Sequence, residues 1–154
     1  MTTAKGHEFW MREAIAEARL AAEEYEVPVG AVAVIGDAIA GRARNLREKT
    51  HNPLGHAELI LIEELARQQK SWRLEDATVY VTCEPCLMCA GAMLQARIPR
   101  VVFGCRDPKA GAMGSLYDVS SDQRLNHRIE VVGGVLEEEC ARLLSDFFRG
   151  LRKK

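Results

Sequence analysis

The stretch VTCEPCLMCAGAML, at positions 81–94, decides the local fold and the chemistry that the rest of the chain has to support. It places three cysteines within seven positions, and Pro85 separates Cys83 from Cys86 and Cys89. In the first turn of a helix, Cys86 and Cys89 have their sulfurs on one face because they are three residues apart. The free N–H groups and the positive dipole at that helix end favour the thiolate, which is the form of cysteine that binds a metal.

A second short motif, GHAE at 55–58, lies upstream and supplies His56 and Glu58. Two thiolates and one imidazole make a three-ligand set with one position open, which is typical of catalytic rather than structural zinc. The open position holds water, whose pKa zinc lowers toward neutrality. We therefore predict that one Zn²⁺ is held by His56, Cys86 and Cys89. Glu58 is the predicted catalytic residue, because a carboxylate beside that water can take its proton and pass it to a substrate nitrogen.

The other cysteines are predicted not to bind the metal. Cys83 is the candidate for a fourth ligand, but it lies on the strand side of Pro85, and the proline stiffens the path back to the metal. Cys105 and Cys140 are interpreted as small buried apolar side chains. A site closed by four protein ligands would instead belong to a zinc-stabilised binding module, a function that gives Glu58 no role.

Helical and strand patterns alternate along the chain and predict an α/β fold. The dipeptide GD at 36–37 predicts a tight turn between two strands. Because the alternation has the spacing of βαβ units, we expect a central sheet with helices on both faces, and His56 and Cys86 at helix starts that meet at one edge of the sheet. The predicted helices are 7–26, 56–70, 86–97 and 137–151, and the predicted strands are 27–35, 38–42, 77–82, 100–104 and 127–136.

Length and composition fit a single domain over residues 1–154. Hydrophobic residues make up 47% and charged residues 28%, as in ordinary globular proteins. The net charge of -1 gives no overall positive field for nucleic acid, so phosphate binding would have to come from local clusters. Two basic clusters are present, Arg42, Arg44, Arg47 and Lys49 in one, and the tail RGLRKK at 149–154 in the other.

The cysteine content and the start of the chain predict a cytoplasmic protein. The segment MTTAKGHEFW lacks the apolar core of a signal peptide, and no run approaches the roughly 18 apolar residues that span a bilayer. Five cysteines is an odd number, and in a reducing compartment clustered cysteines are more often metal ligands or catalytic groups than disulfides. We therefore expect no membrane association.

The two motifs, GHAE and EPCLMCAGAM, resemble the H-x-E and P-C-x-x-C pattern of the cytidine and deoxycytidylate deaminase superfamily. Around them, EVPVGAVAV, RVVFGCRDPKAGAMGSLYDV, LNHRIEV and ECARLLSDFFR are similar to bacterial tRNA-specific adenosine deaminases along nearly the whole chain. The resemblance implies a three-layer α/β/α fold with a central mixed sheet, a homodimer, one Zn²⁺ per subunit and no organic cofactor. It also implies hydrolysis of the wobble adenosine of a tRNA anticodon loop to inosine.

The resemblance further implies substrate contacts. Val29, Asn45 and Phe148 fall where the family lines its base pocket, and Asp107, in CRDPK, falls where the family approaches the sugar. Two positions depart from the family pattern, because LGHAE stands where Thr-Ala would precede the histidine, and Cys83 stands in place of leucine. The alternative function is a zinc-dependent deaminase of free guanine, cytosine or a nucleoside, which would share every zinc residue and have no use for a basic tail.

Overall fold

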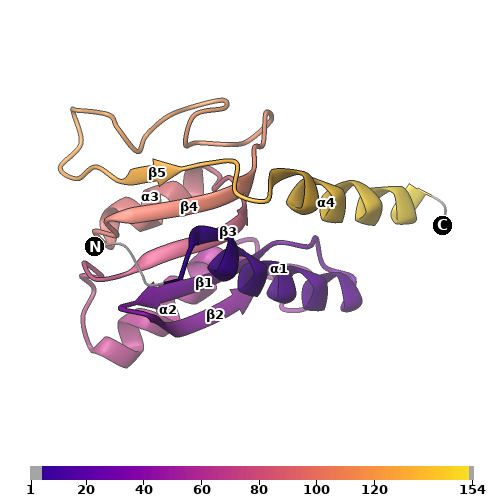
Figure 1. Cartoon of the computed structure of the whole chain (residues 1–154), viewed down its shortest axis with the longest axis horizontal. Helices are drawn as coiled ribbons and strands as arrows, with labels where there is room; N and C mark the ends of the chain where they lie inside the picture. Colours follow the sequence, from indigo (N-terminus) through magenta and orange to yellow (C-terminus); the bar gives the residue numbers. More distant parts are fainter. Residues whose placement is uncertain (1–4, 153–154) are drawn as a thin grey trace.

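A five-stranded mixed sheet lies at the centre of the structure, a computed structural model that describes residues 5–152. Its strands run in the order β2-β1-β3-β4-β5 (Figure 1). β1 is antiparallel to both β2 and β3, whereas β3, β4 and β5 are parallel to one another. In chain order the elements are α1 (His7–Glu23), β1 (Gly30–Ile35), β2 (Ala38–Arg44), α2 (Ala57–Gln69), β3 (Thr78–Cys83), α3 (Leu87–Gln95), β4 (Arg100–Cys105), β5 (Glu130–Val132) and α4 (Glu137–Arg152).

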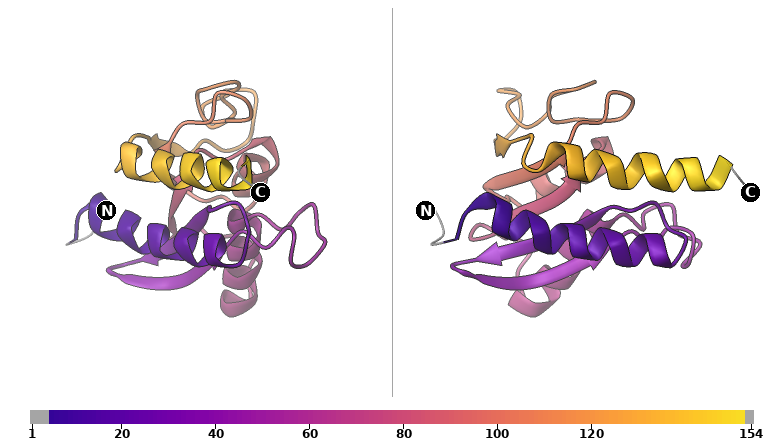
Figure 2. Two further views of the ribbon diagram at one scale, coloured as in Figure 1. Left: turned by 90° about the vertical axis from the view of Figure 1, so that its right-hand side faces the viewer. Right: turned by 45° about the vertical axis from the view of Figure 1, so that its right-hand side comes forward.

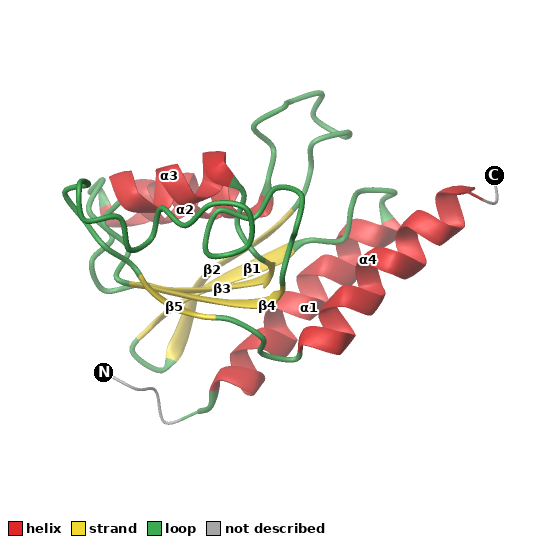
Figure 3. Cartoon of the chain, turned by 90° about the horizontal axis from the view of Figure 1, so that it is seen from above, coloured by secondary structure: helices red, strands yellow, loops and turns green. Residues whose placement is uncertain are grey.

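Helices cover both faces of the sheet. α2 and α3 lie on one face, and α1 and α4 lie on the other (Figures 2 and 3). Successive strand residues point to opposite faces, so Val79 and Val81 pack in the core beneath α2 and α3, while Tyr80 and Val102 pack beneath α1 and α4. This arrangement confirms the predicted three-layer α/β/α fold with a mixed sheet.

The first hairpin and the helix before it keep their predicted order with shifted ends. Gly36 and Asp37 form the two-residue turn between β1 and β2, and Gly36 has a φ of 66°, as the first central position of a type II′ turn requires. The helix predicted over 7–26 ends at Glu23, because Tyr25 adopts a φ of 63° that helical backbone does not allow.

The last strand is much shorter than predicted. The pattern over 127–136 indicates a long strand, but β5 spans only Glu130–Val132 and pairs along one side, with β4. Gly133 then passes so close to the Phe103 ring that an added Cβ would lie 2.5 Å from it. Gly134 turns the chain away with a φ of 86°. Close packing and a glycine turn, rather than loss of apolar character, end the strand.

The chain segments that carry the sequence motifs lie at one edge of the sheet, the one formed by the start of β1 and the ends of β2, β3 and β4. Gly30 pairs with Arg44, so the start of β1 lies beside the end of β2. β3 also runs antiparallel to β1 and ends at the same edge. The pairing of Cys83 with Cys105 then places the end of β4 there as well. Because α2 follows β2 and α3 follows β3 on the same face, the starts of both helices meet at this edge, as predicted.

The C-terminal helix α4 extends beyond the sheet (Figure 1). Of the predicted basic tail, Lys153 and Lys154 lie outside the described residues. Within residues 5–152, every helix is too short or too polar to cross a bilayer.

Candidate active site

Three metal-binding side chains converge where α2 and α3 begin. The Nδ1 atom of His56 lies 3.6 Å from the sulfur of Cys86 and 3.5 Å from the sulfur of Cys89. All three ligand atoms lie within 4.8 Å of one another. Among residues 5–152, no other group of three histidine, cysteine or acidic side chains converges in this way. Cys83 is not a member of the group, as predicted.

Both helices begin with a residue that does not cap them. His56 occupies the N-cap position of α2 and Cys86 that of α3, each with extended backbone and no side-chain hydrogen bond to the first turn. A serine, threonine, asparagine or aspartate there would stabilise the helix by roughly 1 kcal/mol. The two N-cap side chains are instead directed toward each other, in the field of two positive helix ends.

Hydrogen bonding shifts the pKa values of the Cys86 and Cys89 thiols in opposite directions. A hydrogen bond from the Cys89 thiol, together with the nearby His56 imidazole, lowers the pKa of Cys86 to about 4. The same hydrogen bond and burial raise the pKa of Cys89. The hydrogen bond between His56 and Cys86 raises the pKa of His56. One thiolate, a second thiol and an imidazole within ligand distance form a sulfur and nitrogen donor set that suits zinc.

Glu58 lies in the first turn of α2, two residues after the N-cap His56. Only 4% of its surface is exposed. Burial raises the pKa of Glu58 to about 7, and the carboxyl group is also hydrogen-bonded to Cys89. A carboxyl group that titrates near neutral pH can both accept and return a proton under working conditions.

A cavity of about 240 Å³ opens beside these groups. Seven of the eight side chains predicted for the site line it, and the remaining one, Cys89, contacts His56 directly. The predicted residues that line it are Val29, Asn45, His56, Glu58, Cys86, Asp107 and Phe148, and the additional ones are Val27, Arg47, Ala57, Cys83 and Glu84.

Asn45 is fixed by hydrogen bonds at both ends of its side-chain amide. Its oxygen accepts the backbone N–H of Arg47 at 3.1 Å, and its nitrogen donates to the carbonyl of Val27 at 3.2 Å. An amide has two N–H donors and two oxygen lone pairs. One donor and one lone pair of Asn45 therefore remain for a further partner in the cavity.

The side chain of Asp107 both binds backbone N–H groups of a turn and lines the cavity. Its Oδ1 atom accepts the backbone N–H groups of Lys109 at 3.1 Å and Ala110 at 3.2 Å, so this oxygen caps a turn. The side chain also lines the cavity. The second carboxylate oxygen is the one that is free of these turn bonds.

Glu84 is the main feature of the site that the sequence did not predict. It is 3% exposed, and its carboxylate accepts the backbone N–H groups of Asp107, Met113 and Ser115 at 3.0–3.1 Å and the hydroxyl of Ser115. Burial acts to raise the pKa of Glu84, but these hydrogen bonds outweigh it and hold the pKa below its usual value. Gly111 packs on the carboxylate so closely that an added Cβ would lie 2.3 Å from it.

The loop that surrounds Glu84 also reaches the metal-binding group. Gly111 forms a β-bridge with Cys86, and the N–H of Ala112 donates to the carbonyl of Pro85 at 2.9 Å. Glu84 thus connects Asp107 with Cys86. A signal for it was present in the sequence, because Glu84 is the only charged residue between Ala77 and Ala96.

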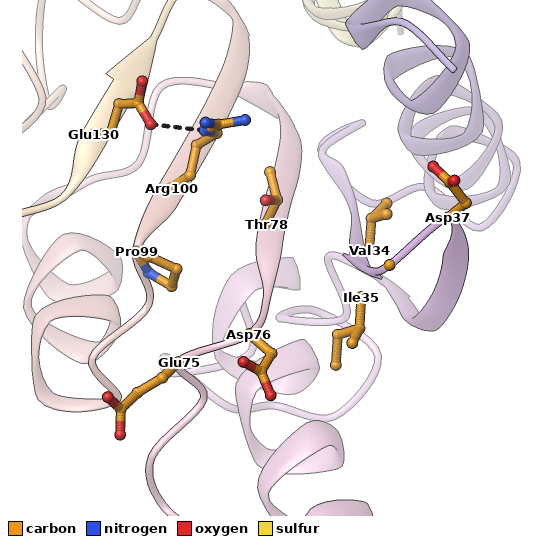
Figure 4. Close-up of a pocket in the computed structure, with 10 residues that line it drawn as sticks. Val34, Ile35, Asp37, Glu75, Asp76, Thr78, Pro99, Arg100 and Glu130 are labelled. Carbon is orange, nitrogen blue, oxygen red and sulfur yellow. Dashed lines mark hydrogen bonds and ion pairs between the residues drawn. The ribbon is translucent and has the colours of Figure 1, made fainter. Parts of the chain in front are cut away.

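A larger cavity, of about 540 Å³, lies at the opposite end of the strands (Figure 4). Carboxyl groups, including those of Glu75 and Asp76, surround it, and Arg100 is paired with Glu130 at 2.8 Å. Of the described residues, no histidine or cysteine lines it. The smaller cavity is therefore the one that combines metal-binding groups with a proton carrier.

Comparison with known proteins gives the family. A relative from Bacillus subtilis, described as a tRNA-specific adenosine deaminase, is 54% identical over 147 residues, which cover 96% of this chain and 91% of the relative. The chain belongs to this deaminase family. A Haemophilus influenzae relative of the same description is 45% identical over 94% of this chain and 84% of its own length. The model of the MafB19-like deaminase family matches residues 5–152.

Solved structures agree with the deaminase family. One, from a study of A-to-I editing by tRNA deaminases at the wobble position, has a TM-score of 0.85 and 38% identity and covers 88% of this chain and 99% of that chain. A guanine deaminase from Nitrosomonas europaea has a TM-score of 0.81 at 16% identity, over 95% of this chain and 86% of that one. At that identity the likeness concerns the fold alone.

We predict that Glu84→Gln destabilises this deaminase. Either placement of the amide directs its nitrogen at a backbone N–H donor, so at least one buried donor loses its acceptor, at about 1–3 kcal/mol. Chemical denaturation should show this loss of unfolding free energy. Glu138→Gln is the control, because Glu138 is exposed and its side chain has no hydrogen bond or ion pair within residues 5–152. Equal stability of the two variants would contradict the structural role of Glu84.

Proposed function

We propose that this deaminase hydrolyses the wobble adenosine of a tRNA anticodon loop to inosine. The observation that carries the proposal is the convergence of the buried Glu58 carboxyl group with three metal-binding side chains at one cavity. The relatives described as tRNA-specific adenosine deaminases support the choice of substrate.

His56, Cys86 and Cys89 are the residues that would hold one Zn²⁺ per subunit. Their two sulfurs and one imidazole nitrogen are the ligands that zinc prefers, and three protein ligands leave one position for solvent. Bound there, zinc supplies a water molecule that is acidic enough to act as a nucleophile near neutral pH.

Glu58 carries protons in the proposed reaction. It accepts a proton from the attacking water and passes it to the nitrogen of the adenine ring next to the reacting carbon. It then takes the second proton, from the hydroxyl group now on that carbon, and delivers it to the amine, which leaves as ammonia while the carbonyl of inosine forms. The reaction consumes one water and releases one ammonia, so the carboxylate returns to its starting state. Its pKa near 7 suits a group that must act as base and acid in one cycle.

The dimensions of the cavity favour one base that has left its stack. Its volume of about 240 Å³ lies below the roughly 300–1,000 Å³ typical of pockets for drug-sized ligands. A base of a single-stranded anticodon loop can enter, while the rest of the RNA stays outside. Val29 and Phe148 offer apolar contacts to its faces, Asn45 the remaining amide donor and acceptor, and Asp107 a carboxylate oxygen for the sugar.

We also propose that the protein acts in the cytoplasm as a homodimer without an organic cofactor. Exposed apolar side chains support the dimer, since Leu87 on α3 and Leu125 are both exposed and border a cavity of about 380 Å³. Burial of such a patch against a second copy would remove apolar surface from water.

The deciding experiment incubates the zinc-loaded protein with bulk tRNA and analyses the digested nucleosides for inosine. We expect inosine to form in tRNA, and free guanine, cytosine and adenosine to remain unchanged. Rapid turnover of a free base or nucleoside, without inosine in tRNA, would replace the proposal by the alternative of a free-base or nucleoside deaminase.

Glu58→Gln should retain zinc and lose activity by at least about 100-fold, because the amide keeps the size of the side chain but cannot carry a proton. Metal content and turnover are measured on the same sample. Glu63→Gln, an exposed position on the same helix, is the matched control and should behave as the wild type. A Glu58→Gln variant with half the wild-type activity would refute the assigned role.

Cys86→Ala should release the metal, whereas Cys83→Ala should keep about one zinc per chain, because only Cys86 belongs to the converging group. Elemental analysis after dialysis distinguishes the two variants. Loss of zinc from Cys83→Ala would mean that the ligand set differs from the one proposed.

A further inference from the structure

Two arginines of the basic cluster at 42–49 are held by acidic partners. Arg42 donates to Glu13 at 2.7 Å and to Glu17 at 3.1 Å. Arg44 donates to Glu24 at 2.6 Å and lies 3.7 Å from Glu17. These ion pairs join β2 to α1 and to the turn that follows α1, so both arginines stabilise the fold.

The other two cations of the cluster differ from each other. Lys49 is exposed and pairs with Glu24 at 2.9 Å. Arg47 is also exposed, and no carboxylate within residues 5–152 lies within ion-pair distance of it. Among residues 5–152, it is the only lysine or arginine that lines the cavity of the candidate active site.

The backbone of Arg47 is held in place although its side chain is exposed. Its N–H donates to the Asn45 side chain at 3.1 Å, and its carbonyl accepts the N–H of Asn52 at 3.1 Å. Gly55 packs so closely that an added Cβ would lie 3.1 Å from the Arg47 Cα atom. The guanidinium therefore extends from a fixed point at the cavity.

We propose that Arg47 binds a backbone phosphate of the RNA strand beside the base that enters the cavity, an inference that rests on the proposed function. The volume of the cavity suits one base, so the phosphates that flank a bound base would stay outside, where Arg47 is exposed. Arginine stays charged at every physiological pH, and its planar fork matches phosphate oxygens.

The charges around the cavity strengthen this assignment. In the described part of the chain three carboxyl groups line it, those of Glu58, Glu84 and Asp107, and Arg47 is the only guanidinium or ammonium group among the lining side chains. A polyanion is repelled by such carboxyl groups, so an arginine that no carboxylate neutralises provides attraction where the polyanion approaches the cavity. Arg42 and Arg44 could bind a phosphate only by giving up their ion pairs with α1 and with the turn that follows α1.

The test measures the salt dependence of binding of an anticodon stem-loop RNA to the zinc-loaded, full-length protein. All proteins carry Glu58→Gln so that the RNA is not consumed. Arg47→Gln should make the log–log slope of affinity against salt shallower by about 0.7, the value for one phosphate contact of a single strand. Arg47→Lys should restore most of the slope, because it restores the charge.

Lys49→Gln is the matched control, two residues away, exposed and already paired. It should leave the slope unchanged. Equal slopes for Arg47→Gln and the parent protein would overturn the inference, and so would an equal reduction by Lys49→Gln, which would indicate a general field. Conversion of tRNA by the wild type together with an unchanged slope in Arg47→Gln refutes this inference alone. Absence of RNA binding by the parent protein refutes the proposed function as well.

Discussion

The candidate site depends on the meeting of two helix starts at one edge of the sheet. β1 lies between β2 and β3 and runs antiparallel to both, so β2 and β3 end at the same edge. The helices that follow these strands cover the same face, and their N-cap residues, His56 and Cys86, come within 3.6 Å. A slip of one residue in the β3 register would turn Val79 and Val81 out of the core beneath these helices. The packing of the core thus fixes the ligand geometry.

This arrangement exchanges local stability for chemistry. Two helices lack a side-chain cap, each at a cost of roughly 1 kcal/mol, because their N-cap residues form the metal-binding group. Metal binding and folding are coupled in such a site, so a bound ion can offset the missing caps. Glu84 stabilises the same edge by another route, since its carboxylate satisfies backbone donors of the loop that bridges to Cys86. Stability at this edge comes from the site itself rather than from ordinary helix capping.

Patterns among neighbouring residues predicted those features of the structure that depend on neighbouring residues. The spacing of Cys86 and Cys89 fixes their common face within one helical turn, and the alternation of strands and helices predicted the layers. Glu84 and Arg47 were not predicted as parts of the site, because the partners that define them are distant in sequence. Glu84 is held by donors 23 to 31 residues away, and Arg47 stands out only once its neighbours are paired with α1 and the turn after it. Val29, Asn45 and Phe148 came from the family resemblance alone, since a valine, a loop asparagine and a helical phenylalanine have no chemical signal of their own.

The carboxyl groups of the cavity repel a polyanionic substrate less strongly than three free carboxylates would. Glu84 spreads its charge over four hydrogen bonds, and one oxygen of Asp107 is engaged by two backbone N–H groups of a turn. The local field that meets an approaching phosphate is therefore less negative than three carboxylates would make it. Under these conditions Arg47, which is held at a fixed point at the cavity and has no ion pair within residues 5–152, would favour the phosphates beside a bound base.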